Sequence, residues 1–325
     1  KKENIACNDL FFDGFKHQLK VAQENNSWFT KDNILFSLES WSKALTQENI
    51  STWIADANLQ NNTKKVAIIM AGNIPLVGFH DFLSVLISGH SVLVKQSSND
   101  KNLLPFLAKY LEYVETTFKG KITFTEEKLT DFDAVIATGS NNTARYFEHY
   151  FKGKPSIIRK NRNSVAVLTN NESDKELTNL SNDIFQYFGL GCRSVSKLFV
   201  PEGYDFNAFF NGLYNKKEII NNAKYANNYD YNKAVYLMSE FDLLENGFLM
   251  IKEDQSYASP IATIFYEYYT DTNKLKEKLK ADSEKIQCVV ANNFIDSEIK
   301  FGQTQHPQLW DYADGVNTLD FLAKL

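Results

Sequence analysis

Short runs of apolar and β-branched residues alternate with helical patterns through most of the chain, and this alternation constrains the fold more than any other feature. Residues 66–70 form such a run, which stops at Ala71-Gly72-Asn73. After Pro75 the apolar residues follow helical spacing as far as Gly89, and residues 91–94 have the composition of a second strand. Strand, helix and strand in this order predict a βαβ unit.

The alternation continues along the rest of the chain. We expect helices at residues 103–118, 143–151, 175–188 and 272–280, and strands at 121–124, 133–137, 165–168, 197–200, 261–266 and 286–291. Helices of this length between short strands predict parallel, doubly wound α/β sheets, in two lobes that meet near residues 155–165. Apolar spacing predicts further helices within residues 8–60, and the Asn- and Tyr-rich residues 221–232 predict a loop.

Charge and composition argue against several classes of function. With 35 Lys and Arg against 40 Asp and Glu, the net charge of −5 disfavours nucleic acid as the main partner. No apolar run approaches the roughly 20 residues of a membrane span, and no signal-peptide stretch follows Lys1-Lys2-Glu3-Asn4. The three cysteines form no CxxC pair, so a reducing, cytoplasmic setting is expected.

Cys192 is the first residue that suggests chemistry. It lies between Gly191 and Arg193 at a turn that ends a predicted helix, and an adjacent guanidinium favours the thiolate form of a cysteine. A small buried residue at a helix end explains the same pattern equally well. Cys7 and Cys288 are weaker candidates, because Cys7 lies in the N-terminal arm and Cys288 in an apolar predicted strand.

Polar residues at other strand ends form a second group of candidates. Asn73 follows the first predicted strand, where open α/β sheets bind ligands, and its amide is suited to stabilising an oxyanion. Lys95 and Ser97 lie at the end of the next strand, and Thr138-Gly139-Ser140 lies where a later strand ends and a helix begins. Lys, Ser and a helix N-terminus at such strand ends are groups that can hold a ribose or a phosphate. Local roles compete with these assignments, namely a turn before a helical Pro for Asn73 and an N-cap for Ser140.

Metal binding finds no support in the sequence. The spacing of the five histidines is not that of metal ligands. They are His17, His80, His90, His149 and His306. We therefore expect no metal site. The motifs of serine hydrolases and protein kinases are also missing from the sequence.

Taken in order, these segments resemble the acyl-CoA reductase branch of the aldehyde dehydrogenase superfamily, the LuxC-like fatty acyl-CoA reductases. Met70-Ala71-Gly72-Asn73-Ile74-Pro75-Leu76 is similar to the strand end that supplies the oxyanion-hole Asn, and Ser91-Val92-Leu93-Val94-Lys95-Gln96-Ser97-Ser98 to the strand whose Lys binds the adenosine ribose. Ala137-Thr138-Gly139-Ser140 is similar to the turn at the pyrophosphate, and Gly189-Leu190-Gly191-Cys192 to the catalytic cysteine segment. The resemblance extends to Phe301-Gly302-Gln303 and Asp311-Tyr312-Ala313-Asp314-Gly315.

The resemblance implies an aldehyde dehydrogenase-like α/β fold, with a Rossmann-type cofactor lobe and an α/β catalytic lobe. It implies N-terminal helices and an NAD(P)-binding domain in residues 1–162, and a catalytic cysteine domain with a C-terminal tail in residues 163–325. Cys192 is then the nucleophile and Asn73 the oxyanion donor. The cofactor is expected to be NADPH, with NADH as the alternative, and its binding residues are Lys95, Ser97, Thr138, Gly139 and Ser140.

One departure from the superfamily is informative. Hydrolytic aldehyde dehydrogenases carry a water-activating Glu, in a Glu-Leu-Gly-Gly context, before the cysteine. The similar stretch here is Ile157-Ile158-Arg159-Lys160-Asn161, which contains no acid. An enzyme that discharges its acyl group to hydride has no need of that base, so its absence favours a reductase.

The expected reaction is the reduction of a fatty acyl-CoA, or of an acylated carrier protein, to a fatty aldehyde through an acyl-cysteine on Cys192. Two alternatives stay open. One is an acyltransferase or thioesterase that uses the same cysteine without hydride chemistry, and the other is a non-catalytic acyl-binding subunit of a larger complex. A homo-oligomer, or a complex with an acyl-activating enzyme, is compatible with the resemblance.

Overall fold

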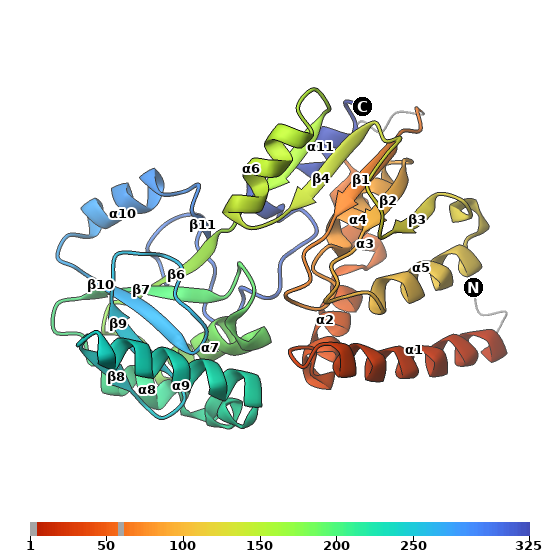
Figure 1. Cartoon of the computed structure of the whole chain (residues 1–325). Coiled ribbons are helices and arrows are strands. Elements are labelled where there is room, and N and C mark those ends of the chain that lie inside the picture. The colour runs from red at the N-terminus through yellow and green to blue at the C-terminus, as the bar shows by residue number, and fades with distance from the viewer. Residues whose placement is uncertain (1–4, 58–61) are drawn as a thin grey trace. The chain divides into compact units, whose positions relative to one another are not determined.

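The chain folds into two compact units, each built around a mostly parallel β-sheet. A computed structural model describes residues 5–57 and 62–325, and Figure 1 shows its elements. The first unit is formed by Lys1–Lys160 with Gln308–Leu325, and the second by Asn161–Pro307. The division falls next to the expected boundary, but the C-terminal residues belong to the first unit, whereas the sequence analysis placed them with the second.

The first unit contains a five-stranded parallel sheet with the order β3-β2-β1-β4-β5. Its strands are β1 (Lys65–Ile69), β2 (Ser91–Lys95), β3 (Ile122–Thr125), β4 (Ala134–Thr138) and β5 (Ser156–Arg159). Its helices are α1 (Ile5–Asn25), α2 (Lys31–Ala44), α3 (Gln47–Ile54), α4 (Phe79–Ile87), α5 (Leu103–Val114), α6 (Asn141–Tyr150) and α11 (Thr318–Leu322), with short 3₁₀ turns at Thr116–Phe118 and Ala313–Gly315. This order is the doubly wound, Rossmann-type arrangement that the sequence predicted.

Two details of the first unit differ from the expectation. The helix after Pro75 begins only at Phe79, because Leu76 adopts a left-handed conformation with a φ of 57°. The edge strand β5 was not predicted. The predicted helices within residues 8–60 are α1, α2 and α3, while residues 58–60 lie outside the described part of the chain.

The second unit contains a six-stranded sheet with the order β11-β6-β7-β10-β9-β8, in which only the pairing of β8 with β9 is antiparallel among the strands described. Its strands are β6 (Asn163–Val167), β7 (Val195–Pro201), β8 (Leu243–Glu245), β9 (Met250–Glu253), β10 (Thr263–Tyr269) and β11 (Ile286–Val290). Its helices are α7 (Asp174–Phe185), α8 (Phe206–Leu213), α9 (Ala223–Met238) and α10 (Thr272–Ala281), with 3₁₀ segments at Gln186–Gly189 and Tyr214–Asn221. Four of these elements were not predicted, namely α8, α9, β8 and β9.

The predicted loop at residues 221–232 is wrong, because most of this stretch belongs to α9. Asn222 is the N-cap, and its side-chain oxygen accepts from the N–H groups of Lys224 and Tyr225, both at 3.1 Å. Tyr225, Tyr229 and Asn232 are buried at helical spacing, and the Tyr225 hydroxyl donates to the Phe248 carbonyl at 3.0 Å. Burial of these large, partly polar side chains outweighs the turn preference of the many Asn residues.

Candidate active site

The carboxyl ends of three neighbouring parallel strands hold most of the candidate residues. β1 pairs with both β2 and β4, and Ile69 at the end of β1 lies opposite Lys95 on one side and Ala137 on the other. Thr138 is the last residue of β4, so Lys95 and Thr138 lie on either side of the end of β1. The strand order reverses between β1 and β4, and open α/β sheets bind ligands at such a switch point.

Asn73 lies in the turn that follows β1, and it is exposed. Two side chains from elsewhere in the first unit hold this turn. The backbone N–H of Leu76 donates to Asp100 Oδ2 at 3.1 Å, and Ser37 Oγ donates to the Pro75 carbonyl at 3.1 Å. A left-handed conformation at a residue such as Leu76 costs on the order of 1–3 kcal/mol, so these contacts stabilise a strained backbone beside Asn73.

The same turn packs directly against the turn that follows β2. A Cβ atom added to Gly72 would lie 2.6 Å from the Ser97 Cβ, so only glycine allows this approach. Asp100, which belongs to the turn after β2, is the acceptor for Leu76. Burial raises the pKa of Asp100 to about 6, although the N–H groups of Leu76 and Leu103 favour its ionised form. The structure therefore brings the turn that carries Asn73 and the turn that carries Ser97 together.

Lys95 and Ser97 present a cation and a hydroxyl at the end of β2. Lys95 Nζ donates to the Glu127 carbonyl at 2.9 Å, which uses one of the three donors of the ammonium group. Ser97 Oγ accepts from the Asn99 N–H at 3.3 Å. Both residues are partly exposed, and their chemistry suits ribose hydroxyls or a phosphate.

Thr138-Gly139-Ser140 forms the turn from β4 into α6. Ser140 is the N-cap of this helix, since its Oγ accepts from the Thr143 N–H at 3.2 Å and lies 2.9 Å from Thr143 Oγ1. The local role considered for Ser140 is therefore present. The N-terminus of α6 also carries the positive end of the helix dipole, which favours phosphate. An ammonium group, hydroxyls and a helix N-terminus along one sheet edge form a donor set that fits a nicotinamide dinucleotide.

Cys192 lies in the second unit, in the turn that joins α7 to β7. The helix ends at Phe185, three residues before the sequence predicted, because Tyr187, Phe188 and Gly189 have φ angles of 55°, 59° and 76°. Ser164 Oγ donates to the Cys192 carbonyl at 2.9 Å and ties the turn to β6. The thiol of Cys192 is exposed, which contradicts the buried structural role considered for it.

The other cysteines differ from Cys192 in their surroundings. Cys288 lies in β11 and is only 5% exposed. Cys7 falls within α1, but its side chain lies outside the described part of the structure. Cys192 is therefore a more accessible thiol than Cys288.

The sequence of the chain matches the family model of acyl-CoA reductase (LuxC) over residues 44–281, which is more than half of its length. The chain belongs to the acyl-CoA reductase (LuxC) family. This membership confirms the resemblance found in the sequence, and it makes the protein an oxidoreductase. No curated protein sequence matches the chain.

Solved aldehyde dehydrogenases share the fold of this acyl-CoA reductase family member. Aldehyde dehydrogenase 21 from Physcomitrella patens, in complex with the reaction product succinate, is 12% identical with a TM-score of 0.65, over 88% of this chain and 70% of its own. An oxidoreductase from Marinobacter aquaeolei is 12% identical with a TM-score of 0.62, over 87% and 70%. The NAD⁺ complex of an aldehyde dehydrogenase from Bacillus cereus is 13% identical with a TM-score of 0.61, over 87% and 69%. The predicted aldehyde dehydrogenase-like fold is confirmed.

In this acyl-CoA reductase family member, the stretch without an acid, residues 157–161, contains an arginine with a structural role. Arg159 ends β5 and is 5% exposed. Its Nη2 donates to Asp81 Oδ1 at 2.7 Å and to Thr318 Oγ1 at 3.0 Å, and its Nη1 donates to the Ala313 carbonyl at 2.7 Å. The guanidinium of Arg159 therefore joins α4 to the C-terminal segment within the first unit.

Sequence reasoning missed two buried residues near the Cys192 turn of this acyl-CoA reductase family member, Asp183 in the helix before it and Thr304, which contacts Arg193. Asp183 Oδ1 accepts from the Thr304 N–H at 2.9 Å and from Thr304 Oγ1 at 2.8 Å, and Arg193 Nε donates to the Thr304 carbonyl. One signal for Asp183 was present, because an acid next to the apolar positions Leu180 and Ile184 lies on the buried face of α7. Nothing in the local sequence marks Thr304.

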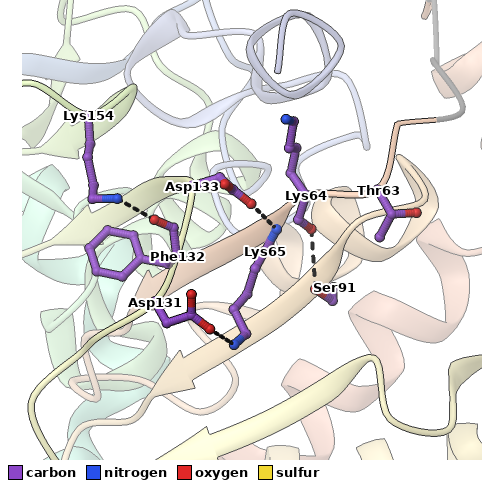
Figure 2. Close-up of a pocket in the computed structure, with 8 residues that line it drawn as sticks. All are labelled: Thr63, Lys64, Lys65, Ser91, Asp131, Phe132, Asp133 and Lys154. Atoms are coloured by element: carbon purple, nitrogen blue, oxygen red, sulfur yellow. Dashed lines mark hydrogen bonds and ion pairs between the residues drawn. The ribbon is translucent and has the colours of Figure 1, made fainter.

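A pocket of about 430 Å³ lies at the opposite edge of the first sheet from the candidate residues (Figure 2). It is lined by Thr63, Lys64, Lys65, Ser91, Asp131, Phe132, Asp133 and Lys154. Lys65 and Ser91 are the first residues of β1 and β2, which places the pocket at the amino edge of the sheet. Lys65 Nζ is paired with Asp131 at 2.9 Å, and Lys154 Nζ donates to the Phe132 carbonyl. Both of these lysine ammonium groups in the pocket therefore already have partners within the protein.

Among residues 5–57 and 62–325, none of the helices combines the length and the apolar character that a membrane span requires. The same ranges contain no group of three His, Cys, Asp or Glu side chains arranged to hold a metal ion.

Proposed function

We propose that the protein reduces a fatty acyl thioester, either acyl-CoA or an acylated carrier protein, to the fatty aldehyde through an acyl-cysteine on Cys192. The observation that carries this proposal is the exposed thiol of Cys192 at the turn into β7, in a chain that belongs to the acyl-CoA reductase family. A thiolate at this position attacks the thioester carbonyl carbon, and a new carbon–sulfur bond forms. Collapse of the tetrahedral species breaks the bond to CoA, whose thiolate leaves and takes up a proton.

We propose two hydrogen-bond donors for the oxyanion, one from the backbone and one from a side chain. The backbone N–H of Cys192 is the first donor, since it belongs to the attacking residue itself. Asn73 is proposed as a side-chain donor, because its exposed amide follows β1 in a turn that Asp100 and Ser37 hold in a fixed conformation. Fixed donors cost little reorganisation when negative charge develops on the carbonyl oxygen.

Cofactor binding is proposed at the carboxyl edge of the first sheet, with NADPH preferred over NADH. Lys95 and Ser97 would hold the adenosine ribose and its 2′-phosphate, and Thr138, Gly139 and Ser140 the pyrophosphate at the N-terminus of α6. A bound nicotinamide supplies the hydride, and with it the two electrons, that converts the acyl-cysteine to aldehyde and frees the thiolate. The NAD⁺ complex of the Bacillus cereus aldehyde dehydrogenase, which shares the fold, supports this class of cofactor.

The structural role of Arg159 supports reduction over hydrolysis. Without a general base, an acyl-cysteine is hydrolysed more slowly by a factor of about 10²–10⁴. The stretch Ile157-Ile158-Arg159-Lys160-Asn161 offers no carboxylate, and the guanidinium of Arg159 is bound to Asp81. The acyl-cysteine should therefore persist until reductant is supplied.

Intact mass spectrometry tests the proposal directly. Mixing the protein with a fatty acyl-CoA in the absence of NADPH should release about one CoA per active site, and the protein should gain the acyl mass. Adding NADPH should then release aldehyde and restore the original mass. The control is Cys288→Ala, which should acylate normally, whereas Cys192→Ala should not acylate although its fold is intact.

Two results would contradict the proposal. Acyl mass that remains in Cys192→Ala but disappears in Cys288→Ala would place the nucleophile elsewhere. Continuous release of CoA and free fatty acid without NADPH would make the protein a thioesterase.

A further inference from the structure

Thr304, in a segment of the second unit that is distant in sequence, contacts a residue on either side of Cys192, namely Asp183 in α7 and Arg193 in the turn itself. On the helix side, Asp183 accepts from the N–H and the hydroxyl of Thr304, and Asp183 Oδ2 also accepts from the Gly302 N–H at 2.6 Å. On the strand side, Arg193 donates to the carbonyl of Thr304. The N–H, the hydroxyl and the carbonyl of Thr304 are thus each bound to a residue on one side of Cys192 or the other. We call Asp183, Arg193 and Thr304 the Thr304 clamp.

The clamp is buried, which makes it costly to leave incomplete. Asp183 and Thr304 are both 0% exposed. A buried donor or acceptor that loses its partner costs about 1–3 kcal/mol, and more when a charged group is involved. Beside the clamp, Gln305 Nε2 donates to Ser194 Oγ at 3.4 Å, which adds a second link between the two segments. The segment around Thr304 and the Cys192 turn should therefore open and close together.

The turn that the clamp spans is strained. Tyr187, Phe188 and Gly189 are three consecutive residues in the left-handed region. This region costs roughly 1–2 kcal/mol for each residue other than glycine, so a turn of this shape needs contacts that hold it. Tyr187 is buried, and the Phe188 ring lies 6.2 Å from the ring of Tyr225, so both residues pack on the helix side of the turn. The clamp joins the helix side to the strand side, across Cys192.

We propose that Asp183 is a positioning residue for Cys192, because through Thr304 and Arg193 it holds residues 187–193 in their strained turn. Asp183 acts on the nucleophile only through these two residues. The clamp is inferred from contacts within the second unit, and its consequence for acylation rests on the proposed function. Loss of the clamp should leave Cys192 exposed but mobile, so that thioester attack slows although the thiol is still present.

Matched variants separate the clamp from general stability. Asp183→Asn keeps the size of the side chain but leaves one acceptor oxygen for three donors. Thr304→Val removes only the hydroxyl, and Thr304→Ser keeps it. Ser181→Ala is the control, because Ser181 is also 0% exposed in α7 and donates to the Thr178 carbonyl at 2.6 Å, away from the clamp.

Amide hydrogen exchange provides a test that does not depend on acyl chemistry. In Asp183→Asn the amides of residues 187–193 and 301–305 should exchange at least about tenfold faster, since a lost hydrogen bond to a charged group is worth 1.4 kcal/mol or more. Thr304→Val should show a smaller increase, whereas Thr304→Ser and Ser181→Ala should exchange like the wild type in both segments. Unchanged exchange at residues 187–193 in both Asp183→Asn and Thr304→Val, or an equal increase in Ser181→Ala, would overturn the proposal.

Rapid-mixing measurement of acylation by a fatty acyl-CoA then tests the consequence for Cys192. Asp183→Asn should acylate about tenfold more slowly at saturation, with little change in the half-saturating acyl-CoA concentration, and Thr304→Ser should retain the wild-type rate. An unchanged acylation rate in a variant with faster exchange would overturn the positioning role. A wild-type protein that takes no acyl group would refute the proposed function, while the exchange experiment would still decide whether the clamp holds the turn.

Discussion

Arg159 and Asp81 form a bidentate ion pair inside the first unit, with side chains that are only 6% and 11% exposed. The pair joins the end of β5 to α4, and further hydrogen bonds from Arg159 fasten the C-terminal segment at Ala313 and Thr318. This arginine belongs to the stretch that, by the resemblance found in the sequence, replaces the segment with the water-activating Glu of hydrolytic aldehyde dehydrogenases. In this chain the stretch has a structural function.

Removing the arginine should therefore cost stability. Arg159→Ala leaves Asp81 buried without its partner, which should lower the free energy of unfolding by about 3–5 kcal/mol. Urea unfolding measures this loss. The neighbouring Lys160→Ala is the control, because Lys160 pairs with Glu148 at 2.8 Å on the surface, where such a pair contributes about 1 kcal/mol or less. Similar losses of unfolding free energy in the two variants would show that the buried pair contributes no more to stability than the surface pair.

Asn73→Ala tests the proposed oxyanion donor. We expect kcat for acyl-CoA reduction to fall about a hundredfold or more, the scale for one such donor, with a smaller effect on substrate binding. Asn49→Ala, which removes another side-chain amide of the first unit, should retain kcat, since Asn49 Nδ2 donates to the Ala44 carbonyl beside α3. An unchanged kcat in Asn73→Ala would leave Asn73 as a turn residue only.

Lys95→Ala tests the proposed cofactor preference. A point charge near the 2′-phosphate matters only when that phosphate is present, so the KM for NADPH should rise more than the KM for NADH. Lys65→Ala is the matched control, because Lys65 lies at the amino end of the neighbouring strand. Steady-state kinetics with both cofactors measure the effect, and equal changes in the two KM values would place Lys95 away from the 2′ position.

The pH dependence of stability should reveal the burial of Asp183. Burial raises the pKa of Asp183 from 3.8 to about 6, although Thr304, Gly302 and Arg193 favour the ionised form. The folded state therefore holds this proton more tightly than the unfolded state, and the stability it contributes below pH 4 is lost as the pH rises through 6. The full effect is on the order of 3 kcal/mol.

Asp183→Asn isolates this contribution, because asparagine does not titrate. The free energy of unfolding of the wild type should exceed that of the variant by more at pH 4 than at pH 7.5, and urea unfolding at both values measures the difference. A wild-type advantage that stays constant or grows as the pH rises would mean that the folded protein does not raise the pKa of Asp183.

Local sequence was sufficient for the features that depend on neighbouring residues. The apolar runs at residues 66–70 and 91–94 became β1 and β2, because the alternation of strand and helix is encoded in short periodic patterns. The positions of Asn73, Lys95 and Thr138 at strand ends followed from the same patterns. Their meeting at one edge of the sheet could be expected, since parallel strands all end on the same side.

Tertiary structure decided what the local patterns leave open. Residues 221–232 have the composition of a loop, but most of them form part of α9, because Tyr225 and Tyr229 are buried there. The C-terminal residues belong to the first unit, where Arg159 donates a hydrogen bond to the Ala313 carbonyl. No sequence pattern shows this contact.

The clamp around Cys192 is the clearest case of this division. The sequence by itself singled out Cys192 between Gly191 and Arg193, because a small-residue turn between a helix and a strand is a local feature. It could not show that Asp183 and Thr304, separated by 121 positions, share two hydrogen bonds in the interior. Such a contact forms only when the packed unit removes both groups from water, since burial makes an unpaired carboxylate or hydroxyl costly. The sequence was therefore sufficient to propose the nucleophile, whereas the contacts that surround Cys192 were decided by the folded unit.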